Sequence, residues 1–362
     1  MRTTLLTAFA LIGFTPAALG CTAVNIVASD GAVVAARSME WALDMAWTAK
    51  TVPAGTEYQM TAPDDLNLEP VSMKTKHAIF GIDTALVPET FFIDAQNDAG
   101  LTFSANFLPN FTEYETVEAD DKGYVSLLEF GMWSLGEFAS VAEFEAALPD
   151  VKVWFGDEKI NGISPEVHFV FTDKTGESIV VEFVNGEQEV HKNVARVLTN
   201  APTYGWHLNN LRNYLDLTPK GEGAVKIGAD NVTALGQGGG LRGVPADYTP
   251  PSRFVKAAYL THFAYEPKNV DEAMTLGEHI LNTVDIPEGV VRSEENGQTV
   301  ADYTQWVVIK DLTNNQITIA DYKHRANSLT IDLDALFESG ESVNTLVTDL
   351  PYPGTEAVTT LK

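Results

Sequence analysis

The chain has 362 residues, of which 45% are hydrophobic and 20% charged, a composition typical of a globular protein with an ample core. Its 50 acidic and 23 basic residues give a formal net charge of −27, so no basic patch for nucleic-acid phosphates is expected and that class of partner is excluded. A single cysteine, Cys21, excludes an internal disulfide.

Residues 1–20 are predicted to be a cleaved secretion signal. One basic residue opens the segment, an apolar stretch and a proline follow, and small residues stand at the usual cleavage offsets, Ala18 and Gly20. Cleavage there would leave a single domain, residues 21–362, in the periplasm. No later apolar run is long enough to cross a bilayer, so no membrane span is expected.

After such a cleavage Cys21 would carry both a thiol and a free α-amine. An amine with a pKa of about 8 can take the proton from its own side chain, which is how amino-terminal nucleophiles are activated. Bacterial lipoproteins also begin at a cysteine, but they attach diacylglycerol to its sulfur, and their signal normally has leucine where this chain has Ala18. A buried packing cysteine is a third interpretation.

Strand-like segments separated by turn residues predict hairpins at both ends of the chain and in its middle. The expected strands are residues 22–28, 33–39, 90–96, 101–108, 167–172, 178–184, 187–191, 195–200, 304–311 and 316–322. A capping box from Ser140 to Glu143 and helical spacing elsewhere predict helices. These are residues 124–135, 144–148, 206–215, 253–263 and 270–284. Glycines around Gln237 predict a long loop over residues 225–251.

Almost every predicted strand pair is joined by a short turn, and the order is strands, helices, strands, helices, strands. That pattern favours antiparallel sheets with segregated helices over alternating βαβ units. We therefore predict an α+β fold, a four-layer αββα sandwich of two antiparallel sheets.

The sequence predicts neither a metal nor an organic cofactor. The seven histidines are scattered without HExxH or clustered ligand spacing, so each is expected to be a surface or packing residue. No glycine-rich loop joins a strand to a helix as phosphate binding requires, and a GxSxG serine motif is absent.

The first predicted hairpin would bring residues 37–41 beside the start of the mature chain. Arg37 there would favour the thiolate of Cys21, and Glu40 could hold the α-amine by a hydrogen bond and by charge. The alternative is that Arg37 and Glu40 merely pair with each other at the end of a strand.

Six segments of this chain resemble the choloylglycine hydrolase family of bile salt hydrolases and penicillin V acylases, which are amino-terminal nucleophile hydrolases. They are Cys-Thr at 21–22, Arg-Ser-Met-Glu-Trp at 37–41, Asn-Asp-Ala-Gly-Leu at 97–101, Ala-Asn-Phe at 105–107, Val-Leu-Thr-Asn-Ala-Pro-Thr at 197–203 and Pro-Ser-Arg-Phe at 251–254. The segments occur in the family's order, and the sixteen-residue step from Cys21 to Arg37 agrees.

The resemblance implies that Cys21 is the nucleophile and its α-amine the proton shuttle, with Arg37 beside the thiol. Glu40 would take the place of the aspartate that many members use to orient the amine. Glutamate in place of aspartate adds one methylene, and glutamate at this position resembles the exported Gram-negative branch of the family. Asn200 would supply an oxyanion-hole amide, and Asn106 matches a position where an amide or phenol assists.

Arg253 would complete the charged set around the cysteine. Taken singly, these residues also have ordinary structural explanations: Asn200 could close a strand into a turn, and Arg253 could be a solvated charge at the start of a helix.

The resemblance implies an exported acylase that hydrolyses a linear amide of a small molecule through a thioester on a free Cys21 thiol, without a cofactor. Penicillin V acylase-like activity is favoured, with N-acyl homoserine lactones as further substrates, and bile salt hydrolysis is the nearest alternative. A non-catalytic, lipid-anchored binding protein is the alternative from another class. The family also implies a homotetramer. Aromatic residues that could line an acyl pocket, or equally pack a core, are Trp41, Trp47, Phe92, Phe103, Phe107, Tyr204 and Trp206.

Overall fold

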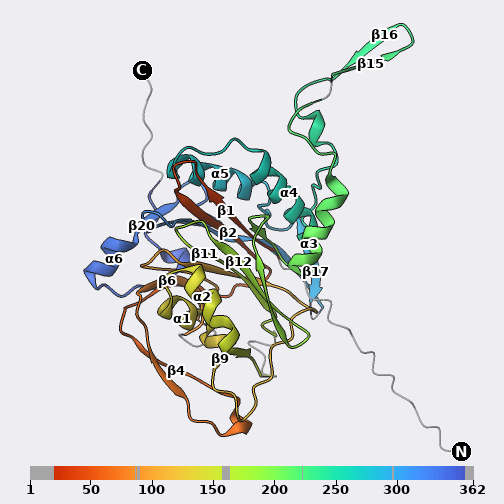
Figure 1. Ribbon diagram of the computed structural model, residues 1–362. Coiled ribbons are helices and arrows are strands. Elements are labelled where there is room, and N and C mark those ends of the chain that lie inside the picture. The colour runs from red at the N-terminus through yellow and green to blue at the C-terminus, as the bar shows by residue number, and fades with distance from the viewer. Residues whose placement is uncertain are drawn as a thin grey trace, which may run out of the picture.

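The computed structural model describes residues 20–354, apart from 86, 88–89, 157–163, 222 and 296. The predicted secretion signal, apart from Gly20, lies outside the described residues. Two large antiparallel sheets stack face to face, and helices cover their outer faces (Figure 1). The predicted αββα sandwich is therefore confirmed.

The first sheet contains seven strands in the order β14-β1-β2-β18-β19-β20, with β17 also paired to β18. Its strands are β1 (Cys21–Val27), β2 (Val33–Trp41), β14 (Val197–Leu198), β17 (Val291–Glu295), β18 (Gln298–Asp311), β19 (Gln316–Asp321) and β20 (Leu329–Asp332). The central pair, β1 and β2, is the hairpin predicted at the start of the mature chain.

The second sheet contains eight strands in the order β13-β12-β11-β8-β7-β6-β3-β21. They are β3 (Trp47–Val52), β6 (Ile79–Thr84), β7 (Asp94–Asn97), β8 (Thr102–Phe107), β11 (Val167–Thr172), β12 (Ser178–Val184), β13 (Glu187–Lys192) and β21 (Asn344–Leu346). Smaller pairs are β4 (Glu57–Met60) with β5 (Val71–Lys74), β9 (Tyr124–Ser126) with β10 (Lys152–Trp154), and β15 (Ala224–Ile227) with β16 (Asp230–Thr233).

Helices cover the two outer faces of the sandwich. They are α1 (Leu127–Glu137), α2 (Val141–Ala147), α3 (Tyr204–Asn210), α4 (Pro250–Phe263) and α5 (Val270–Asn282), while α6 (Leu333–Ser339) packs on β19 and β20 beside the core between the sheets. Helices α4 and α5 pack on β1, and α5 also packs on β2, whereas α1 packs on the second sheet through Phe130, whose ring lies 4.8 Å from that of Phe169. Short 3₁₀ turns span Asp64–Leu66, Leu148–Asp150, Leu211–Tyr214, Gly239–Leu241 and Val347–Asp349.

Three large buried cores separate the four layers, and a small fourth cluster contains Val33, Ala35 and Leu312. One lies between the second sheet and α1 and α2, and one lies between the first sheet and α4 and α5 and extends to Val170 and Val180 of the second sheet. The third lies between the sheets and contains Cys21 itself, together with Met39 and Trp306. The start of β1 is therefore held inside the sandwich rather than frayed.

Several predicted boundaries were wrong for identifiable reasons. Residues 124–126 form a strand rather than a helical turn, because the Ser126 side chain caps α1 by accepting a hydrogen bond from the Leu128 N–H. Only Val197–Leu198 of the predicted strand at 195–200 is a strand, since Arg196 before it has a φ of 55°. The predicted loop at 225–251 contains most of the β15–β16 hairpin, which projects away from the sandwich (Figure 1).

None of the helices within the described ranges combines the length and apolar character needed to span a bilayer.

Candidate active site

The pleat of β2 decides which side chains surround the thiol. Cys21 is the direct antiparallel partner of Met39. Arg37 precedes Met39 by two residues in β2, so its side chain lies on the same face of the strand. Cys21 Sγ is 3.7 Å from Met39 Sδ and 3.4 Å from Arg37 Nη2. Glu40, the next residue after Met39, points to the opposite face. All four residues are buried.

Arg37 spans the space between the two sheets. Besides the thiol, its Nη2 donates to the carbonyl of Ala105 at 2.7 Å, and its Nε donates to Asn106 Oδ1 at 3.3 Å. The guanidinium also lies 4.9 Å from the ring centre of Trp306. The predicted neighbourhood of Arg37 and Cys21 is therefore present, and the arginine is rigidly held.

Burial raises the pKa of the Cys21 thiol above its ordinary value, while the positive charges of Arg37 and Arg253 oppose that rise. Arg37 thus acts in the predicted direction, but burial outweighs it. In a chain where Gly20 still precedes the cysteine, the thiol remains protonated at neutral pH. A nucleophilic role of the sulfur would therefore require a separate base.

Glu40 is completely buried against Gly20, the residue before Cys21. Its backbone N–H donates to the Gly20 carbonyl at 2.8 Å, and its Oε1 accepts from the Thr304 hydroxyl at 2.8 Å. Within the described residues, Glu40 Oε2 makes no hydrogen bond of standard geometry, although the Ser38 side chain interacts with this carboxyl group, and no ion pair joins Glu40 to Arg37. The alternative in which these two residues merely pair with each other is therefore not what the structure contains.

Replacing Glu40 by glutamine should change how stability depends on pH. Burial raises the pKa of Glu40 to about 7, against the opposing charge of Arg253, so the folded chain binds this proton more tightly than the unfolded chain. The protonated Glu40 contributes about 3 kcal/mol to the free energy of unfolding. This contribution is complete below about pH 4.5 and is lost as the pH rises through about 7.

Urea unfolding of the chain that retains Gly20, at pH 5 and pH 8, tests this expectation. The wild type should lose more stability than Glu40→Gln between these two pH values. Identical pH dependence of the two proteins would contradict the assignment of a neutral, buried Glu40.

Asn200 and Arg253 meet at the backbone of Cys21. Asn200 Oδ1 accepts hydrogen bonds from the Cys21 backbone nitrogen and from Arg253 Nη2, both at 2.7 Å. Arg253 Nη1 donates to the Cys21 carbonyl at 2.6 Å and to Thr22 Oγ1 at 2.7 Å. Asn200 therefore does more than close a strand, and Arg253, fully buried near the start of α4, is not a solvated charge.

The amide groups of Asn200 and Asn106 differ in the hydrogens they have available. A carboxamide nitrogen carries two hydrogens. Asn200 Nδ2 uses one on the Phe107 carbonyl at 3.0 Å and retains one. Asn106 Nδ2 contacts two carbonyls, those of Leu198 at 3.2 Å and Thr199 at 2.9 Å. Asn200 therefore has one side-chain hydrogen left to donate to an oxyanion, whereas both hydrogens of Asn106 face carbonyls. Assistance from Asn106 at an oxyanion stays a prediction.

The thiol opens onto an almost wholly apolar cavity of about 80 Å³. Its lining residues are Cys21, Arg37, Met39, Trp41, Met45, Trp47, Thr84, Val87, Phe91, Ile93, Ala105, Phe107, Pro165 and Val167. The rings of Trp41 and Phe107 meet edge to face with their centres 5.7 Å apart. This cavity can seat an apolar group against the sulfur.

Of the predicted aromatic lining residues, the structure brings Trp41, Trp47 and Phe107 to this cavity. The other four do not line it: Phe92 and Phe103 belong to the core beneath α1, Tyr204 is fully buried in the core beneath α4, and Trp206 is 44% exposed. Met45, Val87, Phe91, Ile93, Pro165 and Val167 also line the cavity but were not predicted, because they stand outside the six family-like segments and no pattern connects them.

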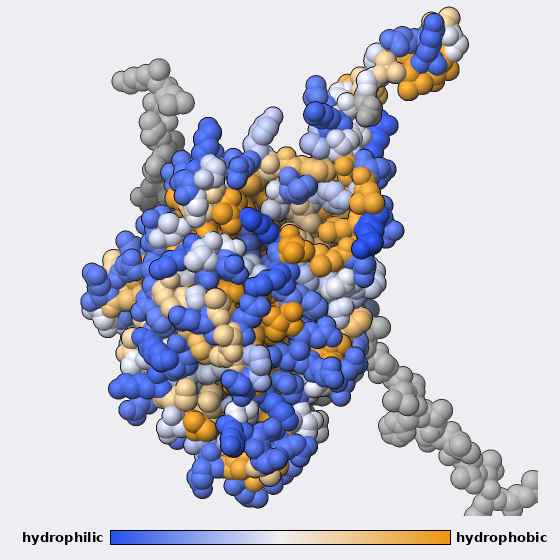
Figure 2. Space-filling view, viewed as in Figure 1, coloured by the Kyte–Doolittle hydropathy of each residue, from blue (hydrophilic) through white to orange (hydrophobic). Residues whose placement is uncertain are grey.

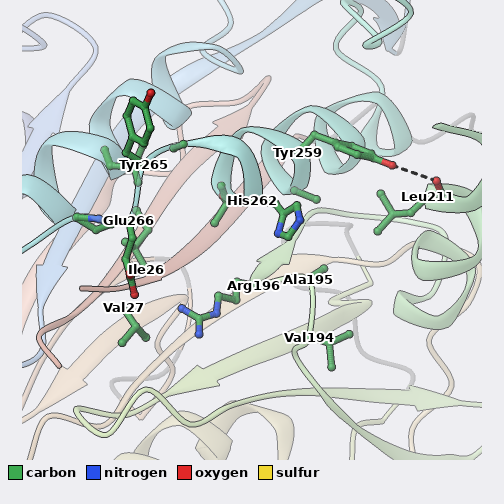
Figure 3. Close-up of a pocket in the computed structure, with 15 residues that line it drawn as sticks. Ile26, Val27, Val194, Ala195, Arg196, Leu211, Tyr259, His262, Tyr265 and Glu266 are labelled. Atoms are coloured by element: carbon green, nitrogen blue, oxygen red, sulfur yellow. Dashed lines mark hydrogen bonds between the residues drawn. The ribbon is translucent and has the colours of Figure 1, made fainter. Parts of the chain in front are cut away.

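A larger cavity of about 600 Å³ lies at the other end of β1, beside the carboxyl end of α4 (Figure 3). Residues from β1, the 194–196 turn and α4 line it, including Ile26, Arg196 and Tyr259, whose hydroxyl donates to the Leu211 carbonyl at 3.5 Å. None of the predicted site residues lines it, whereas Cys21 and Arg37 both line the smaller cavity.

Among the described residues, the ligand atoms of Glu182, Glu189 and His191 lie within 4.8 Å of one another. Glu182, however, already accepts hydrogen bonds from the Tyr204 backbone and faces His168 Nδ1 at 2.7 Å. We therefore assign Glu182 to a hydrogen-bond network and not to a metal site.

Two antiparallel sheets between helical layers, with a cysteine at the head of a central strand and an arginine beside it, define the amino-terminal nucleophile sandwich. The chain belongs to the choloylglycine hydrolase family of linear amide C–N hydrolases, whose model matches residues 21–341. It is therefore a hydrolase of linear amide bonds.

Similar proteins agree with that assignment. The chain is 33% identical to the bile salt hydrolase/transferase of Clostridium perfringens over 258 residues, which are 69% of this chain and 78% of that protein. The crystal structure of a variant of the conjugated bile acid hydrolase from C. perfringens superposes with a TM-score of 0.75 at 27% identity, covering 87% of this chain and 93% of that one. Penicillin V acylase from Agrobacterium tumefaciens shares the fold, with a TM-score of 0.70 at 20% identity, covering 88% of this chain and 87% of that one.

Proposed function

We propose that this protein is an exported cysteine acylase that cleaves linear amides with a compact apolar acyl group. The observation that carries the proposal is the position of Cys21 Sγ, 3.4 Å from Arg37 Nη2 and open to the apolar cavity. Removal of residues 1–20 in the periplasm would convert the Cys21 nitrogen, now 2.7 Å from Asn200 Oδ1, into an α-amine next to its own thiol.

The reaction proceeds in two steps. The α-amine takes the thiol proton, the sulfur attacks the amide carbonyl, and the remaining Asn200 N–H stabilises the oxyanion. The protonated amine then gives its proton to the leaving nitrogen, which breaks the C–N bond and leaves a thioester on Cys21. Water hydrolyses the thioester and restores the thiol. Glu40, whose backbone N–H already bonds the carbonyl of the residue before Cys21, would hold the ammonium in place.

The acyl group is expected to be aromatic or fatty, because the cavity beside the thiol is lined by Trp41, Trp47 and Phe107 together with aliphatic side chains. We therefore propose penicillin V and N-acyl homoserine lactones as substrates. Conjugated bile salts are the second candidate, favoured by the 33% identity to a bile salt hydrolase/transferase.

A substrate panel tests this assignment. The purified mature protein would be assayed with penicillin V, penicillin G, long- and short-chain acyl homoserine lactones, and glyco- and tauro-conjugated bile acids. The highest kcat/KM on penicillin V supports the proposal, and a higher value on bile acids establishes the second candidate. Absence of hydrolysis across the panel contradicts an acylase.

Export and the free thiol need their own measurement. Intact mass of the protein recovered from the periplasm of a Gram-negative host should correspond to a chain that starts at unmodified Cys21. A diacylglycerol adduct on Cys21 would instead support the lipid-anchored binding protein.

We also propose that the protein forms a homotetramer, with the β15–β16 hairpin bound by another copy. All residues of the two strands are exposed, and pairing places Val225, Ile227 and Val232 on one face of the hairpin, which lies far from the body (Figure 2). Because an isolated two-stranded hairpin is marginally stable in water, a partner surface would account for it.

Lysine at both Val225 and Ile227 should convert the tetramer to smaller species, since each charge would have to be buried in the interface. Light scattering coupled to gel filtration measures the mass. Lysine at both Asn231 and Thr233 places the same charge on the opposite face of the hairpin and is the matched control. An unchanged mass for the double variant would exclude this hairpin from the interface.

A further inference from the structure

Three buried polar side chains form one row across the second sheet, beside the site. Asn106 on β8 is the antiparallel partner of His168 on β11, and His168 Nδ1 lies 2.7 Å from Glu182 Oε1 on β12. All three residues have zero exposure. Polar groups buried in this way are costly unless they are paired, so their partners indicate what the row does.

The row ends on the carbonyl of Thr199, the residue before Asn200. That oxygen accepts a hydrogen bond from Asn106 Nδ2 at 2.9 Å and lies 3.0 Å from His168 Nε2. A carbonyl can only accept, so His168 Nε2 carries a hydrogen. Two donors occupy both lone pairs of the oxygen and fix the peptide unit whose nitrogen belongs to Asn200.

Glu182 holds both sides of the Asn200 turn. Its carboxylate faces His168 Nδ1, which keeps the ring oriented with Nε2–H directed at Thr199. The same carboxylate accepts from the Tyr204 backbone N–H at 2.9 and 3.0 Å, and Tyr204 is the first residue of α3. One side chain therefore fixes the chain before and after Asn200.

A residue of helix α3 holds the carbonyl of Asn200 itself. His207 Nε2 donates to the Asn200 carbonyl at 2.8 Å, and its ring stacks on Phe254, with centres 4.5 Å and planes 9° apart. Burial lowers the pKa of His207 to about 4, so the ring is neutral at physiological pH. Phe254 follows Arg253, the other partner of Asn200 Oδ1.

We propose that His168 and Glu182 are positioning residues for the hydrolysis. They hold the Thr199 carbonyl so that Asn200 keeps its contact with the Cys21 nitrogen and directs its free N–H to the oxyanion. Neither side chain lines the cavity beside the thiol, so each acts through Asn200. This inference rests on the proposed role of Asn200 in the acylase reaction.

The test compares two substitutions of His168. His168→Leu removes the donor, and kcat should fall about 10- to 100-fold with KM within about twofold, because misplacing a catalytic group costs rate and not binding. His168→Gln places an amide nitrogen close to the original Nε2 and should recover most of the loss. His191→Gln is the matched control, since His191 lies 3.8 Å from Glu182 Oε2 but makes no contact with Thr199 within the described residues.

Hydrogen exchange at residues 197–203 is the second readout and needs no substrate. Protection of this segment should be lost in His168→Leu and kept in His168→Gln. The inference is overturned if His168→Leu keeps wild-type kcat and protection, or if His168→Gln is as impaired as His168→Leu in both. A wild-type protein that hydrolyses no amide would overturn the proposed function, while the exchange measurement would still decide the inference.

Discussion

Replacing Cys21 by alanine should lower amide turnover by about 10⁴-fold or more, since the nucleophile of a covalent mechanism has no substitute. No second thiol exists in the chain, and the sulfur is the atom that faces Arg37 at 3.4 Å in the apolar cavity. Initial rates on the best substrate of the panel measure the loss. Intact mass after rapid quenching should show an acyl adduct on the wild type and none on Cys21→Ala.

A chain that retains Gly20 separates the thiol from the amine. It keeps the sulfur, but its Cys21 nitrogen is a peptide nitrogen that cannot act as a base. Burial keeps the thiol protonated in that form, so this chain should be as inactive as Cys21→Ala. A thermal unfolding midpoint close to that of the wild type is the control for folding. Appreciable turnover by either protein would contradict the amino-terminal nucleophile mechanism.

The part of the site that could be predicted from the sequence is the part that lies within one hairpin of fixed register. The strand period of two and a turn at residues 29–31 were enough to place Arg37 beside Cys21. Asn200 and Arg253 come from segments 179 and 232 residues away from Cys21 in sequence, and only the resemblance to a family connected them to it.

The apolar cavity and the polar row were not predictable in the same way. Cavity residues come from separate strands and loops between 21 and 167, and each looks like an ordinary core residue in its own segment. His168 and Glu182 lie within the strands β11 and β12, where local pattern indicates only burial. Their relation to Thr199 depends on sheet register and on the fold of a chain segment that precedes α3.

The β15–β16 hairpin was missed for a different reason. All residues of its two strands are exposed, and the alternation of Val225, Lys226 and Ile227 is too short to distinguish a strand from a loop. Glycines nearby then favoured a loop. If the hairpin is bound by another copy, the pattern that specifies it depends on the assembled protein.

Asn200→Ala should lower kcat by about 10²- to 10³-fold with a smaller change in KM, which is the cost of removing one oxyanion donor. The substitution also removes the acceptor shared by the Cys21 nitrogen and Arg253. Asn200→Asp separates these effects, because it keeps an acceptor oxygen but loses the N–H donor. If donation to the oxyanion is what matters, both variants should be impaired to a similar extent.

Asn213→Ala, on the exposed surface after α3, is the matched control and should retain wild-type kcat. Asn200→Asp with nearly full activity would show that Asn200 serves only to hold the amine and Arg253, and the oxyanion would then need another donor. Because Asn106 has both of its side-chain hydrogens on carbonyls, the next candidate donor would be Arg37 Nη1, which has no hydrogen-bond partner within the described residues. The two variants thus distinguish an electrostatic role of Asn200 in the transition state from a role in orienting the nucleophile.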